Sequence, residues 1–166
     1  LVKLLKANDI LGVAWGTTTL EIARQMPQYH VEGVRVVSLN GCTYENTMDE
    51  GLFEVSRVFG RKLRASLFHL YTPVIVSSEE VKRVYLSDNH TRRTMEYIAQ
   101  SNITLNGVGN FSRDSMLYRY GYITEGERAA LEAKGTVGNF CSLYYDIDGN
   151  PVAPDLNART IGISLE

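Results

Sequence analysis

Short continuous runs of hydrophobic residues alternate along this chain with stretches in which hydrophobic residues recur at helical spacing. Residues 10–15 form one continuous run, typical of a strand that is covered on both faces. Leu20, Ala23 and Met26 then recur at helical spacing, and Pro27 marks the end of that stretch. Gly16 stands between the two and permits a sharp turn. The pattern predicts a strand, a glycine turn and a helix.

The same alternation continues over the rest of the chain. Further strands are predicted at residues 35–41, 65–71, 103–108, 137–145 and 160–165, and helices around residues 52–63, 81–85 and 95–99. Helix ends are indicated by the capping boxes Ser77–Glu80 and Thr124–Glu127, by Asp88 as a cap, and by Gly135. Strands that alternate with helices predict an α/β domain with a mainly parallel sheet, and 166 residues fit one domain.

Three of the predicted strands run into polar loops that contain glycine. These loops carry Gly16, Thr17, Thr18 and Thr19; Asn40 and Gly41; and Gly107, Gly109 and Asn110. If the strands are neighbours, the loops share one rim of the sheet, where ligands of open parallel sheets gather. The first turn of the helix offers free N–H groups, and the threonines add small hydroxyls, so we expect a phosphate site there. The alternative is that a threonine merely caps the helix.

Motifs of several common sites are incomplete in this sequence. A P-loop needs a lysine after its glycine turn, whereas Thr17 follows Gly16. A dinucleotide fingerprint that begins at Gly107 has Ser112 in place of its third glycine. Asp146, Asp148 and Asn150 alternate as in a calcium loop, but the required glycine and glutamate are missing, and Asp148-Gly149 predicts a hairpin turn instead.

The remaining candidate groups show no catalytic or metal-binding spacing. The histidines are His30, His69 and His90, and the acids weighed as general bases are Asp49, Asp114 and Asp146. No histidine pair has metal-ligand spacing, and loop acids are usually solvated, so we expect no metal, no cofactor and no assignable catalytic residue.

Composition and net charge limit the binding partners and the cellular location that we expect for this chain. A net charge of −2 gives no electrostatic case for nucleic-acid or membrane binding by this segment, and no apolar stretch approaches the ~20 residues that cross a bilayer. Cys42 and Cys141 lie in apolar surroundings and are expected to be buried thiols of a cytoplasmic protein. Because the chain starts without an initiator methionine and ends on a predicted strand, we expect a domain of a longer protein.

Five motifs in order carry a resemblance to a known family: "DILGVAWGTTTLEIA", "VVSLNG", "ITLNGVGNFSRDSML" with "GYIT", "KGTVGNFCSLYYDIDGNPV" and "LNARTIGISLE". Over essentially the whole chain, residues 1–166, they resemble the effector-binding (sugar-binding) domain of SorC-type bacterial transcription regulators, a group that includes the deoxyribonucleoside and central-glycolytic regulators.

The resemblance implies a fold, a ligand and partners. The fold would be a three-layer α/β/α arrangement similar to sugar-phosphate isomerases and glucosamine-phosphate deaminases. The ligand would be a phosphorylated sugar, with its phosphate on Gly16, Thr17, Thr18 and Thr19 and its sugar in a pocket lined by Asn40, Gly41, Gly107, Gly109, Asn110 and Asn139. The domain would form dimers or tetramers, and operator DNA would be bound by a helix-turn-helix that this chain lacks.

This sequence departs from the family pattern at two positions. Cys42 stands where a second glycine is common, and Asn139 stands where an acid often contacts sugar hydroxyls. Family members also continue into a glycine-rich segment with a phosphate-facing lysine, so we expect this chain to lack the C-terminal end of the domain. The leading hypothesis is a ligand-sensing module that modulates DNA binding. The alternatives are a sugar-phosphate isomerase or deaminase of the same fold class and a purely structural oligomerisation domain.

Overall fold

The structure, a computed structural model, describes residues 1–42 and 51–164. Its strands are β1 (Ile10–Val13), β2 (Arg35–Ser38), β3 (Ser66–Phe68), β4 (Ile103–Leu105), β5 (Val108–Asn110), β6 (Gly138–Phe140) and β7 (Leu143–Tyr145). Its helices are α1 (Thr17–Gln25), α2 (Gly51–Leu63), α3 (Glu79–Ser87), α4 (Asn89–Ala99), α5 (Met116–Arg119), α6 (Glu125–Ala133) and α7 (Pro154–Arg159).

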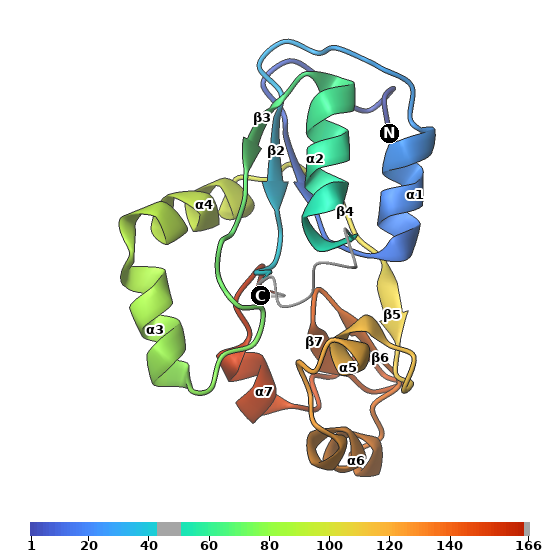
Figure 1. The fold of residues 1–166 in the computed structure, drawn as a ribbon, viewed down its shortest axis with the longest axis vertical. Helices are drawn as coiled ribbons and strands as arrows, with labels where there is room; N and C mark the ends of the chain where they lie inside the picture. Colours follow the sequence, from blue (N-terminus) through green and yellow to red (C-terminus); the bar gives the residue numbers. More distant parts are fainter. Residues whose placement is uncertain (43–50, 165–166) are drawn as a thin grey trace.

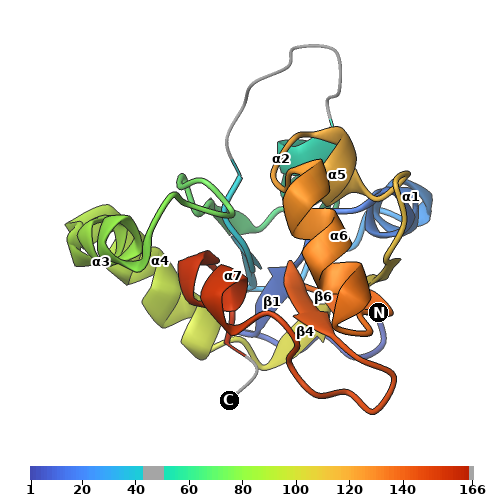
Figure 2. The ribbon, with the colours of Figure 1, turned by 90° about the horizontal axis from the view of Figure 1, so that it is seen from below.

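A four-stranded parallel sheet forms the middle layer of the fold. Its strand order is β3-β2-β1-β4, with Leu11 of β1 opposite both Val36 of β2 and Ile103 of β4. Helices α1 and α2 pack together over one face of the sheet, while α4 covers the other face and packs on α3 (Figures 1 and 2). This arrangement confirms the predicted three-layer α/β fold with a parallel sheet.

Strand β1 is buried on both faces, as its continuous apolar run predicts. Leu11 and Val13 belong to the apolar cluster beneath α1 and α2, whereas Ile10 and Ala14 belong to the cluster on the α4 side. The alternation follows from the two-residue period of a strand. Phe59 of α2 is fully buried in the first cluster, and burial of such a side chain contributes about 1.5–3 kcal/mol. The two clusters hold the central strand rigidly in place.

A second, antiparallel sheet follows the parallel one and was not predicted. Its order is β5-β6-β7, and it packs with α5, α6 and α7 around a third apolar cluster that includes Leu117, Leu131 and Tyr144. The capping box of Thr124 and Glu127 starts α6 as predicted, and Gly135 follows the end of α6 with a φ of 78°. In Figure 1 this unit lies below the carboxyl ends of β1 and β4.

Two predicted strands are each divided in the structure. The run at residues 103–108 breaks at Asn106 and Gly107, so that β4 joins the parallel sheet and β5 joins the antiparallel one. The run at residues 137–145 is a hairpin, whose turn residues Cys141 and Ser142 have positive φ angles of 48° and 69°. Asparagine and glycine usually fill such a turn, and their absence explains why the pattern predicts one strand.

Smaller features of the structure also differ from the prediction. Ser78, not Ser77, caps α3, because its hydroxyl accepts the N–H of Val81 at 3.2 Å. The predicted strand at residues 160–165 forms only isolated bridges over its described part, such as the one between Asn40 and Gly162. Helices α5 and α7 are too short to show a helical period in the sequence. Asp88 caps α4 as predicted.

Candidate functional site

The loops that follow β1, β2 and β4 meet at one edge of the parallel sheet. The N–H of Leu39 donates to the carbonyl of Val13, and the N–H of Ala14 donates to the carbonyl of Leu105, each at 3.0 Å. With part of the second sheet, the three loops border a cavity of about 300 Å³. The predicted convergence of the loops is confirmed. The chain runs from β1 through β2 to β3 on one side of β1 and then crosses to β4 on its other side, so the cavity lies beside the point where the strand order reverses, the usual place for a ligand in such sheets.

Most of the predicted site residues line this cavity. They are Gly16, Thr17, Thr18, Thr19, Asn40, Gly107, Gly109, Asn110 and Asn139. Gly41 is the exception and is not among the residues that line this cavity. A Cβ atom on Gly41 would lie 2.6 Å from the carbonyl oxygens of Thr72 and Pro73, and its N–H donates to the carbonyl of Ile161. Gly41 therefore serves close backbone packing beside the cavity.

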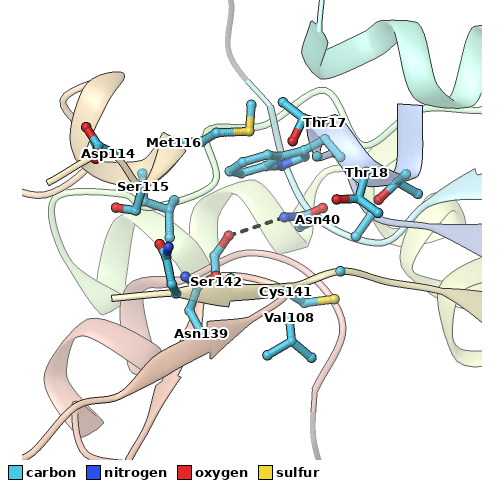
Figure 3. Close-up of a pocket in the computed structure, with 18 residues that line it drawn as sticks. Thr17, Thr18, Asn40, Val108, Asp114, Ser115, Met116, Asn139, Cys141 and Ser142 are labelled. Carbon is cyan, nitrogen blue, oxygen red and sulfur yellow. Dashed lines mark hydrogen bonds between the residues drawn. The ribbon is translucent and has the colours of Figure 1, made fainter. Parts of the chain in front are cut away.

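Helix α1 begins at the cavity without a side-chain cap. Its N-cap is Gly16, whose φ of 157° and ψ of 153° fall in a region that is essentially restricted to glycine. No side chain in the described structure caps the helix, and its first turn holds no acidic residue, so the alternative of a capping threonine is wrong. Thr17 and Thr18 are exposed at this end (Figure 3). The free N–H groups and the helix dipole favour an anion.

Asn40 lies at the buried end of the cavity. It is 2% exposed, and its Nδ2 donates a hydrogen bond of 3.2 Å to the hydroxyl of Ser142 in the β6–β7 turn (Figure 3). Asn40 and Trp15 both line the cavity, and Oδ1 of Asn40 and Nε1 of Trp15 are buried atoms with no hydrogen-bond partner among the described residues. A buried polar atom without a partner costs about 1–3 kcal/mol, so these two atoms are suited to a polar ligand group.

The antiparallel sheet forms the opposite wall of the cavity. Gly109 of β5 pairs with Asn139 of β6, and a Cβ atom on Gly109 would lie 2.6 Å from Nδ2 of Asn139. The glycine leaves the space that the asparagine side chain occupies. Because an amide can both donate and accept hydrogen bonds, Asn139 can pair with either a donor or an acceptor in the cavity.

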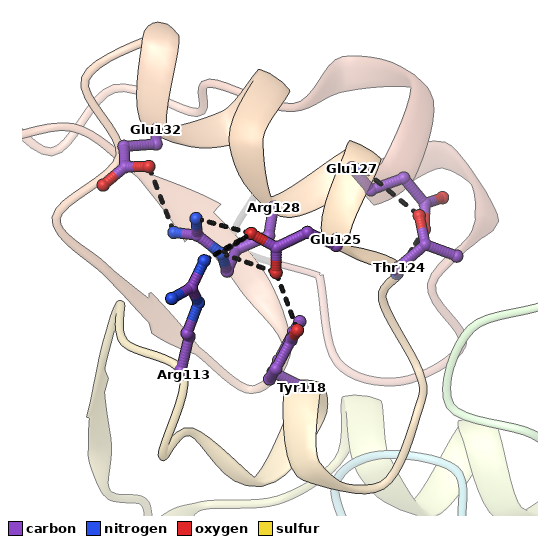
Figure 4. A network of polar contacts seen from close by, with 7 residues as sticks. All are labelled: Arg113, Tyr118, Thr124, Glu125, Glu127, Arg128 and Glu132. Atoms are coloured by element: carbon purple, nitrogen blue, oxygen red, sulfur yellow. Dashed lines mark hydrogen bonds and ion pairs between the residues drawn. The ribbon is translucent and has the colours of Figure 1, made fainter.

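Residues 114–117 form a third wall. Among the lining residues that the structure describes, Asp114 is the one carboxylate, and none is a histidine, lysine or arginine. The two residues that flank this wall, Arg113 and Tyr118, both bind the carboxylate of Glu125 at the start of α6, at 2.9 and 2.7 Å (Figure 4). Arg128 is a third partner at 2.9 Å. Hydrogen bonds from Arg128, Tyr118 and Arg113 hold the pKa of Glu125 well below its ordinary value.

A polar cluster around His69 lies behind the cavity. Nδ1 of His69 is 3.2 Å from the hydroxyl of Ser56 and 3.4 Å from that of Ser38. Burial lowers the pKa of His69, and the positive charge of Arg57 lowers it further. Both serines line a small second cavity, which Trp15 and Asn40 separate from the first. The ring therefore accepts or donates hydrogen bonds as a neutral group near pH 7.

The other groups weighed from the sequence hold the fold together or lie outside the site, except Cys141, which lines the cavity. Within residues 1–42 and 51–164, no cluster of three His, Cys, Asp or Glu side chains could hold a metal ion. Asp146 accepts the N–H groups of Asp148 and Asn150 in the predicted turn, and Asp49 lies outside the described residues. Cys42 and Cys141 are free and buried, and burial raises the pKa of both thiols to about 12.

Sequence reasoning missed several residues of the site. The sequence pattern places Trp15 at the end of a strand and Ser142 in the middle of a predicted strand, and it assigns Ser115, Met116 and Leu117 to no element. The two residues of the β6–β7 turn have positive φ angles, but neither is a glycine or an asparagine, so the sequence gives no sign of the turn. The unusual tryptophan directly before the glycine turn was the one signal available for Trp15.

Comparisons with known proteins give a consistent picture. The family described as "Putative sugar-binding domain" matches residues 1–166. The deoxyribonucleoside regulator of Bacillus subtilis (strain 168) is 36% identical over 162 residues, which cover 98% of this chain and 51% of the regulator. The chain thus spans about half the length of the curated relatives it matches.

Solved structures show the same fold at lower identity. A DeoR family transcriptional regulator from Listeria monocytogenes has a TM-score of 0.86 at 23% identity, with coverage of 98% of this chain and 64% of that one. The full-length sorbitol operon regulator SorC from Klebsiella pneumoniae has a TM-score of 0.82 at 21% identity, with coverage of 98% and 52%. Among the described helices, none combines the length and the apolar character needed to cross a membrane. The chain belongs to the family of sugar-binding domains found in SorC/DeoR-type transcriptional regulators.

Proposed function

We propose that this domain senses a phosphorylated sugar and passes the signal to the DNA-binding part of a regulator. The observation that carries the proposal is the uncapped N-terminus of α1 at one end of a cavity whose remaining walls offer amides and hydroxyls. A phosphate needs several N–H donors and tolerates no nearby carboxylate cap, and the first turn of α1 meets both conditions. A sugar needs groups that donate and accept, as Asn40, Asn139 and Ser142 can.

The phosphate would bind the N–H groups of Thr17, Thr18 and Thr19, with the threonine hydroxyls as further donors. These groups are neutral, and the described lining residues include no lysine or arginine. Binding would therefore rely on helix-end donors and on hydrogen bonds that are stronger than usual because the phosphate is charged. The opposite end of the ligand would lie against the β6–β7 turn, where Asn40 is buried and donates a hydrogen bond to Ser142.

Regulation requires that the ligand bind two states of the protein with different affinity. Residues of both the parallel-sheet half and the antiparallel-sheet half line the cavity, and a ligand that contacts both would favour one relative placement of them. A change of this kind can alter the contacts of the domain with another subunit. This route supports a regulator that acts as a dimer or a tetramer.

An enzyme of the same fold class is the second candidate. Isomerisation or deamination of a sugar phosphate needs an acid and a base beside the open-chain sugar. Asp114 is the one carboxylate that lines the described cavity, and Cys141 stays a neutral thiol because burial raises its pKa to about 12. The relatives with assigned roles are transcriptional regulators, which favours sensing over catalysis.

A panel of sugar phosphates separates the candidates. For a sensor, at least one sugar phosphate raises the Tm and is recovered unchanged after incubation. For an isomerase or deaminase, the same compound is converted. If no sugar or sugar phosphate shifts the Tm, the domain serves oligomerisation alone and the proposal is wrong.

A further inference from the structure

Trp15 and Asn40 stand between the main cavity and the small cavity behind it. Both residues line both cavities. Nε1 of Trp15 and Oδ1 of Asn40 are buried, and neither has a hydrogen-bond partner among the described residues. One atom is a donor and the other is an acceptor. Buried polar atoms are nearly always paired, so two unpaired ones of opposite type at one boundary need an explanation.

The pair matches one chemical group in particular. A hydroxyl donates one hydrogen bond and accepts others, whereas a phosphate or a carbonyl oxygen only accepts. A phosphate would satisfy Trp15 but would place its charge against the carbonyl oxygen of Asn40. We infer that Nε1 of Trp15 and Oδ1 of Asn40 together bind one hydroxyl of the sugar, which makes these two residues determinants of specificity. This inference rests on the proposed function.

The orientation of Asn40 is fixed before any ligand binds. Its Nδ2 is occupied by the hydroxyl of Ser142, so Oδ1 is the part of the amide left for the ligand. Its backbone is held by the bridge to Gly162, where a Cβ atom would lie 2.9 Å from Cα of Asn40. The Trp15 ring packs against both the first and the third apolar clusters. Because both side chains are already ordered, ligand binding loses little conformational entropy, and the site can discriminate more strongly between ligands.

The consequence is a strong preference at a single carbon of the sugar. A ligand with hydrogen in place of that hydroxyl leaves both buried atoms unpaired and excludes the water that could serve them. We expect its affinity to fall by roughly tenfold or more, while removal of any hydroxyl that faces solvent has a small effect.

The experiment uses the one tryptophan of the chain as its reporter. Glucose 6-phosphate, fructose 6-phosphate, ribose 5-phosphate and their unphosphorylated sugars are titrated while Trp15 emission is recorded. For the tightest ligand, each monodeoxy derivative is then titrated by calorimetry. The variant is Trp15→Phe, which keeps a ring and removes the donor. Tyr144→Phe is the matched control, because its buried hydroxyl also has no partner among the described residues yet does not line the cavity.

One monodeoxy derivative should bind wild-type protein and Tyr144→Phe roughly tenfold more weakly than its parent sugar phosphate. Of all the derivatives, it should also change the Trp15 emission spectrum the least. Trp15→Phe should lose most of that discrimination. Equal discrimination in Trp15→Phe and wild type, or no sensitive hydroxyl in wild type, would overturn the inference and leave the proposed function standing. Sensitive binding of an unphosphorylated sugar with the same affinity as its phosphate would support the pair and overturn the phosphate assignment. If no compound binds, both are wrong.

Discussion

The side chain of Asn40 donates a hydrogen bond to the hydroxyl of Ser142, 3.2 Å away and 102 positions later in the chain. Asn40 follows β2 of the parallel sheet, and Ser142 forms the turn of the β6–β7 hairpin. The bond therefore joins the two halves of the fold at the buried end of the cavity. A ligand placed there touches both halves, which is the geometric requirement for a sensor.

Replacing Thr18 by valine should weaken sugar-phosphate binding by roughly tenfold or more, because a hydroxyl that binds a charged phosphate is lost. Thr18 is exposed at the first turn of α1, so stability should change by no more than about 0.5 kcal/mol. Calorimetry measures the affinity, and urea unfolding measures the stability. Thr104→Val, an exposed position of β4 away from the cavity, is the control. Equal affinity in the two variants would remove Thr18 from the site.

Replacing Gly109 by alanine should disturb the cavity wall. The new methyl group would stand 2.6 Å from Nδ2 of Asn139, so the asparagine side chain must turn aside. We expect a loss of about 1 kcal/mol in stability and weaker ligand binding. Gly126→Ala is the matched control, because its methyl group meets nothing closer than 4.0 Å and α6 should gain about 0.5–1 kcal/mol. Ligand binding as strong in Gly109→Ala as in the control would show that Asn139 is not part of the site.

Replacing Glu125 by glutamine should loosen the wall formed by residues 114–117. Glutamine keeps the shape but loses the charge that holds Arg113 and Arg128, and ligand affinity should fall on the order of twofold to tenfold. Glu132→Gln is the control, since Glu132 contacts Arg128 alone in this network (Figure 4). Added salt should reduce the difference between wild type and Glu125→Gln. An affinity that is the same in all three proteins would show that the network does not support the wall.

His69 should make the domain less stable in mild acid. Its folded pKa lies below the ordinary value of 6.5 because of burial and Arg57. As the pH falls through 6.5, the unfolded chain binds a proton that the folded chain does not, so the free energy of unfolding decreases. Unfolding in urea at pH 7.5 and pH 5.5 should show a smaller decrease for His69→Gln than for wild type. His90→Gln, an exposed control, should behave as wild type. A His69→Gln variant with the full decrease would contradict this assignment.

The parallel sheet and the glycine turn before α1 could be predicted from the sequence because their signals are local. The apolar run through Val13, the turn at Gly16 and the helix that follows lie within a few residues of one another. The meeting of the loops also followed from a general rule, since the carboxyl ends of neighbouring parallel strands lie at one edge. Many of the lining residues on those loops were predictable, but Trp15 and Val108 were not, and Gly41 was included although it does not line the cavity.

The antiparallel half was not predictable in the same way. A hairpin turn at Cys141 and Ser142 depends on positive φ angles that tertiary packing imposes on ordinary residues. The contact of Asn40 with Ser142 is a tertiary relationship with no local signal. The two unpaired atoms, Nε1 of Trp15 and Oδ1 of Asn40, are visible only when every neighbour is in place. The inference that Trp15 and Asn40 bind one hydroxyl of the ligand therefore could be made only from the structure.

Calorimetric titration of the protein with its tightest sugar phosphate, with the same sugar lacking the phosphate, and with inorganic phosphate as a competitor tests the central claim most directly. The account predicts that the sugar phosphate binds at least roughly tenfold more tightly than the free sugar and that inorganic phosphate competes with it. Equal affinity for the two sugars, with no competition by phosphate, would contradict an anion site at the first turn of α1.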